Sequence, residues 1–214
     1  MKKVIVTLMA LAMCFGLSTC VQAARPEPDW LELLIDAAAS GDREAGLSAA
    51  AGWNSGAGHR PVDYDDLVLL SKLITWEAGS PWLNDVMRMS VGEVVLNRVA
   101  SPEFPDTLAD VICQEGEYPE VNAPSFWREL TPTRPCVEAA LRLLLGQRVL
   151  QPQVVYQSST PRGKIHATYS DLRLGFTYFC ESSHPELYLP SLPKAEDLAL
   201  ALRAAVRAGL CPCR

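Results

Sequence analysis

The chain lacks the residues and motifs on which several common enzyme classes depend. It has only three histidines, His59, His166 and His184, and it contains no HExxH zinc-binding helix, no GxSxG nucleophile elbow and no phosphate-binding P-loop. A His/Asp metal set of the kind typical of wall amidases is also missing. A Cys/His protease remains open, although no cysteine lies in a recognisable nucleophile context.

Basic residues are fewer than acidic residues, and the sequence has one long hydrophobic run. That run, Val4–Leu17, follows Lys2 and Lys3 and precedes a small-residue cleavage site at Ala23, which is the pattern of a secretory signal peptide. At 14 residues it is shorter than the roughly 20 residues of a membrane span. We therefore expect residues 1–23 to be removed and the protein to be secreted, with no membrane span. The alternative is a lipoprotein anchored at Cys20.

The signal segment holds two of the 19 Lys and Arg residues and none of the 25 Asp and Glu residues. Residues 24–214 therefore have 17 basic and 25 acidic side chains, a net charge of −8. An acidic protein of this kind is poorly suited to nucleic acid or to an anionic membrane, because both require clustered basic side chains. We expect no nucleic-acid partner, and we expect a monomer.

Cysteine is available outside the signal segment, but its number is odd. Five cysteines remain there, so at least one thiol is unpaired within the chain. Cys180, His184, Cys211 and Cys213 could together make a closed tetrahedral zinc site, although their spacing is not that of a standard zinc finger. A zinc-stabilised structural protein is therefore one alternative. The favoured interpretation has no metal and no cofactor.

Hydrophobic periodicity predicts a mostly α (α+β) protein with a small β element. Residues 24–63 should form an N-terminal helix, a second weak helix and a linker, and residues 64–214 the main domain with a C-terminal helix over 194–209. Residues 114–134 are expected to be a loop. Helices are predicted from about 63 to 79, 84 to 100, 107 to 113 and 135 to 146. Two β-like runs are predicted at 154–157 and 176–180, separated by a polar loop.

One glutamate stands out in the strongest predicted helix. Glu77 follows Leu70 by seven residues and Ile74 by three, so it lies along the apolar stripe in the last helical turn. Burial and the negative end of the helix dipole both raise the pKa of a carboxyl group placed there. A raised pKa is what a general acid needs near neutral pH. The alternative is a solvated glutamate at a helix end. Glu93, within the next predicted helix, is expected to be exposed.

The stretch from Asp65 to about Cys180 resembles the SleB-type cell wall hydrolases, the family of spore-cortex-lytic enzymes. The matching segments, in the same order as in the family, are TWEAG (75–79), VGEVVLNRVASPEFPDT (91–107), VICQEGEYPEV (111–121), VEAALRLLLGQRVL (137–150) and QVVYQ (153–157). Two departures are Trp76, where alanine is frequent, and Glu117, where the family's loop often has glutamine.

The resemblance implies a lysozyme-like helical domain that cleaves the bond between N-acetylmuramic acid and N-acetylglucosamine in peptidoglycan glycan strands. It also implies that the secreted protein acts at the cell wall. It places the catalytic acid at Glu77, and it leaves open lytic transglycosylase or muramidase activity, on spore cortex or on vegetative wall. We expect Gln114, Glu117, Tyr118, Phe126 and Tyr156 to bind substrate. Glu117 could instead be a second catalytic group. Asn97 and Arg98 are expected to hold the helix pair together. The remaining alternative is a non-catalytic glycan-binding module.

Overall fold

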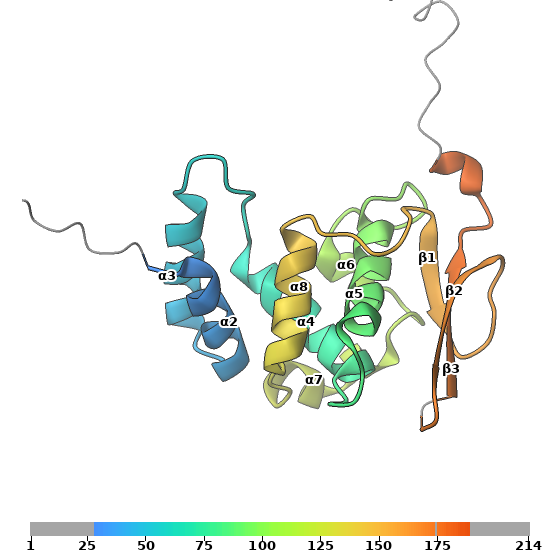
Figure 1. The fold of residues 1–214 in the computed structure, drawn as a ribbon, viewed down its shortest axis with the longest axis horizontal. Coiled ribbons are helices and arrows are strands. Elements are labelled where there is room, and N and C mark those ends of the chain that lie inside the picture. Colours follow the sequence, from blue (N-terminus) through green and yellow to red (C-terminus); the bar gives the residue numbers. More distant parts are fainter. Residues whose placement is uncertain (1–27, 174, 189–214) are drawn as a thin grey trace, which may run out of the picture.

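The structure is a computed structural model that describes residues 28–173 and 175–188, and it confirms the mostly α (α+β) expectation (Figure 1). The helices are α2 (Trp30–Ser40), α3 (Arg43–Asn54), α4 (Tyr64–Ala78), α5 (Asp85–Val99), α6 (Leu108–Ile112), α7 (Pro124–Arg128) and α8 (Arg134–Leu144). Two short 3-10 helices, η1 (Pro119–Asn122) and η2 (Pro185–Leu187), and three strands, β1 (Val154–Ser158), β2 (Ile165–Asp171) and β3 (Gly175–Glu181), complete the described part.

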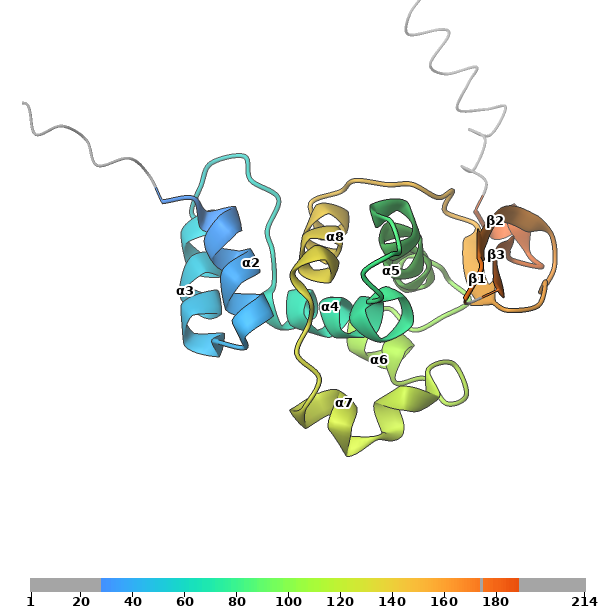
Figure 2. The ribbon, with the colours of Figure 1, turned by 60° about the horizontal axis from the view of Figure 1, so that its bottom comes forward.

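Helix α4 is the central element of the fold. It contacts α5 and α8 on one side and α6 on the other, and Figure 2 shows it passing between these groups. Its predicted stripe is confirmed, because Leu67, Leu70, Leu73 and Ile74 have no exposed surface. The Asp63 side chain accepts hydrogen bonds from the free backbone N–H groups of Asp65 and Asp66, so it caps the helix start. The same helix thus anchors the core and carries Glu77 at its other end.

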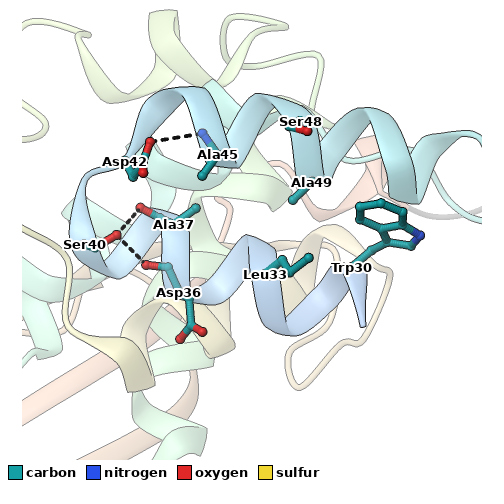
Figure 3. A pocket seen from close by; sticks show the side chains of 9 residues that line it. All are labelled: Trp30, Leu33, Asp36, Ala37, Ser40, Asp42, Ala45, Ser48 and Ala49. Carbon is teal, nitrogen blue, oxygen red and sulfur yellow. Dashed lines mark hydrogen bonds between the residues drawn. The ribbon is translucent and has the colours of Figure 1, made fainter. Parts of the chain in front are cut away.

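The α2–α3 hairpin packs on the opposite side of the molecule from the sheet (Figure 1). Arg134 at the start of α8 forms ion pairs with Glu32 and Asp36 of α2, and Leu34 and Ala38 join the main hydrophobic core. A shallow groove of about 360 Å³ lies along the hairpin, where the small side chains Ala45, Ser48 and Ala49 of α3 lie across from Leu33 and Ala37 of α2 (Figure 3). The hairpin is therefore an integral layer of the core.

The three strands form an antiparallel sheet in the order β1–β3–β2. The two predicted β-like runs correspond to β1 and β3. The segment between them, which we expected to be a polar loop, contains β2. That strand alternates polar residues with Ala167 and Tyr169, and these two pack on the core from the same side as Phe179 of β3.

The region 114–134 is also more ordered than predicted, because η1 and α7 lie within it. The prediction that Glu93 is exposed is wrong. Its side chain has no exposed surface, and its carboxylate accepts hydrogen bonds from the backbone N–H groups of Val149 and Leu150.

Among the described residues, no helix is both long and apolar enough to cross a membrane. The predicted signal segment 1–23, the 194–209 helix, Cys211 and Cys213 lie outside the described residues.

Candidate active site

Glu77 occupies the last turn of α4, one residue before the helix ends at Ala78. Ile74, one turn earlier on the same face, is fully buried, whereas Glu77 itself is partly buried. The carboxyl group therefore lies where the apolar stripe of the helix meets the surface. This is the placement that the helical spacing predicts.

The sheet supplies the first polar partner of Glu77. Gln157 on β1 donates a hydrogen bond from its side-chain nitrogen to Oε2 of Glu77, at 3.1 Å. Gln157 pairs in register with Phe179 on β3, which is 2% exposed and belongs to the core. Side chains paired across a ladder lie on the same face of the sheet, so the core-facing side of the sheet holds the amide against the end of α4. One oxygen of Glu77 is thereby fixed.

A second carboxyl group, which the sequence analysis did not identify, lies beside Glu77. Glu120 on η1 is only 9% exposed, and its Oε1 atom is buried with no hydrogen-bond partner among the described residues. Its side chain is within hydrogen-bonding reach of the Glu77 carboxyl group. Two carboxylates are both acceptors, so they can share a hydrogen bond only when one of them carries a proton.

The surroundings raise the pKa of Glu77 to about 8, mainly because burial penalises the charged form. The hydrogen bond with Glu120 and the negative charge of Glu120 act in the same direction, and the hydrogen bond from Gln157 opposes them. Desolvation is the cause that the sequence predicts. The structure adds a neighbouring carboxyl group, so that Glu77 holds its proton at neutral pH.

This raised pKa predicts a measurable effect on stability. The pKa of Glu77 rises from an ordinary value of 4.5 to about 8 on folding. The contribution of protonated Glu77 to the stability of the fold is therefore fully present below pH 4.5 and is lost as the pH rises to 8. Replacing Glu77 with glutamine, which never ionises, should increase the free energy of unfolding at pH 8 by about 1–3 kcal/mol relative to the native protein. Urea unfolding of both proteins at pH 4 and pH 8 measures this difference in the free energy of unfolding.

At pH 4 the two proteins should have similar stability, because Glu77 is then protonated in both the folded and the unfolded state. Glu115→Gln, at an exposed position of the neighbouring loop, is the matched control and should show no such gain. A Glu77→Gln variant that gains nothing between pH 4 and pH 8 would contradict the assignment of a protonated Glu77.

Arg98 and Asn97 join α5 to β1, and not to another helix as predicted. Arg98 donates from Nε to the carbonyl oxygen of Val155 at 2.7 Å, and its guanidinium forms a 2.7 Å ion pair with Glu117. Asn97 donates to the carbonyl oxygens of Gln151 and Val154. These residues position the strand that carries Gln157.

The five residues predicted to bind substrate differ in how far their side chains are exposed. Gln114, Glu117 and Tyr156 are partly exposed, whereas Tyr118 is 8% exposed and Phe126 has no exposed surface. Burial raises the pKa of Tyr118 to about 12, so its phenol stays neutral. Phe126 belongs to the core, and its ring lies edge-on to the rings of Trp76 and Trp127, which are both exposed.

The described residues contain no group of three or more side chains that could hold a metal ion. Cys113, Cys136 and Cys180 are free thiols, and Cys180 is fully buried. The other two cysteines of the zinc alternative, Cys211 and Cys213, lie outside the described residues.

Comparison with known proteins supplies one match. Residues 85–164 match the cell wall hydrolase family. The matched segment begins after Glu77 and includes Arg98, Glu117, Glu120 and Gln157. Searches of curated proteins and of solved structures found no match. The resemblance drawn from the sequence motifs is thus confirmed over residues 85–164, which are similar to cell wall hydrolases.

Proposed function

We propose that this protein is a lytic transglycosylase that cleaves the bond between N-acetylmuramic acid and N-acetylglucosamine in peptidoglycan, with Glu77 as the single catalytic acid. The family match indicates an enzyme that acts on peptidoglycan. The observation that carries the finer proposal is the environment of Glu77: a carboxyl group that retains its proton near neutral pH, fixed on one side by Gln157.

The protonation state of Glu77 suits glycosidic bond cleavage. A general acid is most effective when its pKa lies near the working pH. In the proposed reaction, the proton of Glu77 passes to the glycosidic oxygen as the bond from that oxygen to C1 of the muramoyl residue breaks. The 6-hydroxyl of the same residue then attacks C1 and returns its proton to the Glu77 carboxylate. The product is a 1,6-anhydro sugar, and the acid is regenerated.

The position of Glu120 favours attack by the substrate's own hydroxyl over attack by an enzyme-activated water. Retaining glycosidases place their two carboxyl groups about 5–5.5 Å apart, and inverting enzymes about 6.5–9.5 Å apart, on either side of the sugar. The Glu120 side chain lies within hydrogen-bonding reach of the Glu77 carboxyl group, and this proximity favours a shared proton over a place for Glu120 across a bound sugar. Glu117, the second catalytic group considered above, is paired with Arg98. Glu77 is then left to act alone.

Substrate contacts are proposed for the partly exposed residues around this acid. Gln114 and Glu117, from the loop after α6, and Tyr156, from β1, can offer hydrogen bonds or ring surface to a glycan strand. The proposal also includes secretion, with removal of residues 1–23, and action without a cofactor. Phe126 is left out of the contact set because its ring is fully buried.

Mass spectrometry of digested peptidoglycan tests this function. Purified protein is incubated with vegetative wall and with spore cortex, beside the Glu77→Gln variant as the matched inactive control. Muropeptides with 1,6-anhydro ends, absent from the control digest, are the expected result. Reducing ends in their place would identify a hydrolase and overturn the transglycosylase assignment. Glycan that is bound by the native protein but stays intact on both substrates would identify a non-catalytic binding module.

A further inference from the structure

We infer that Glu120 is a positioning residue that holds the catalytic proton on Glu77 between turnovers and draws it back at the end of each reaction. This inference rests on the proposed function of Glu77. It extends that function by giving a role to a buried carboxyl group that single-acid chemistry does not otherwise use.

The hydrogen bonds around Glu77 determine where the proton lies. Gln157 donates to Oε2 of Glu77, so Oε1 is the atom left to carry a proton. Glu120 offers only acceptor oxygens when ionised, and its buried Oε1 has no hydrogen-bond donor among the described residues. A proton on Glu77 therefore completes the one hydrogen bond that the two carboxyl groups can share.

No cation in the described part of the chain neutralises Glu120 through an ion pair. The nearby guanidinium of Arg98 is engaged by Glu117 and by the carbonyl oxygen of Val155. Tyr118, whose pKa both glutamates help to raise, remains a neutral phenol, and Gln157 is uncharged. The described residues therefore offer Glu120 no compensating positive charge, and the proton on Glu77 faces it directly.

This arrangement has a consequence in both halves of the reaction. When Glu77 gives its proton to the glycosidic oxygen, two carboxylates face each other without a proton between them. Their repulsion raises the proton affinity of Glu77, because like charges disfavour the ionised form. Glu77 then becomes a stronger base for the proton of the attacking 6-hydroxyl, and the rest state is restored.

The pH dependence of the cleavage rate, measured for native enzyme and for Glu120→Gln, tests the inference. Activity requires protonated Glu77, so the rate of the native enzyme should fall above about pH 8. Loss of the Glu120 charge should move this alkaline limb down by about one pH unit or more. Glu120→Asp, which keeps the charge, should restore part of the shift, and Glu115→Gln should leave the limb in place.

A purely structural role for Glu120 would lower the rate equally at every pH, and this outcome, in a variant with a native circular dichroism spectrum, would overturn the inference. Carbon-13 NMR titration of the Glu77 carboxyl group provides a readout independent of catalysis. A Glu77 pKa that is unchanged in Glu120→Gln would also overturn it. A pKa that falls while the rate profile stays fixed would support the coupled pair and instead refute Glu77 as the catalytic acid.

Discussion

Replacing Glu77 with glutamine should reduce the rate of glycan cleavage by about 10²–10⁴-fold, the usual contribution of a general acid. The amide has nearly the same shape as the protonated carboxyl group, and its oxygen can still accept the hydrogen bond from Gln157. It has no acidic proton to give to the glycosidic oxygen. Binding of glycan should therefore be retained while cleavage is lost, which a comparison of kcat with KM on soluble glycan strands would show.

The same change is expected to stabilise the fold near pH 8, so a loss of activity cannot be attributed to unfolding. Glu115→Gln is the control in the neighbouring loop and should cleave at the native rate. If Glu77→Gln retained more than a tenth of native kcat, the proton donor would have to be another group.

Replacing Arg98 with methionine should lower the free energy of unfolding by about 2–4 kcal/mol. The Arg98 side chain is 4% exposed, and its guanidinium lies 5.0 Å from the ring centre of Phe104 and 5.5 Å from that of Tyr118. Breaking a buried ion pair by removing one partner is strongly destabilising, because the other charge is left without compensation. Glu117 is 24% exposed, so water offsets part of that loss. Urea unfolding at neutral pH gives the value.

Two further variants separate the charge from the packing. Arg98→Met combined with Glu117→Gln should recover part of the stability, because the unpaired carboxylate is then gone. Arg128→Met, at an exposed position on α7, should change stability by less than about 0.5 kcal/mol. An Arg98→Met protein as stable as the Arg128 variant would show that the ion pair contributes nothing to the fold.

The elements that sequence reasoning located correctly are those with strong local signals. Asn84 and Thr107 cap α5 and α6 through their side chains, as short polar residues before apolar runs predict. Glu77 belongs to this group, because its position on the α4 stripe follows from helical spacing alone. Local patterns were sufficient wherever one helix determines the answer.

The features that were missed depend on contacts between distant segments. Ile165–Asp171 has few apolar residues, and it becomes a strand because it pairs with β3. Glu93 looks like a surface residue in its own helix, but it is buried by the backbone of residues 149 and 150. Glu120 could not be identified, because η1 reaches Glu77 only through the folded path of the 114–134 segment. The charged sequence EGEYPE (115–120) was the one visible signal.

The hydrogen bond between Gln157 and Glu77 spans 80 positions of the chain, and this separation determines when the site can form. A ribosome makes Glu77 well before Gln157, and contacts between such distant residues form slowly during folding. A nascent or truncated chain ending before β1 would contain the acid without the amide that orients it. The proposed site is therefore complete only after β1 has been added to the chain.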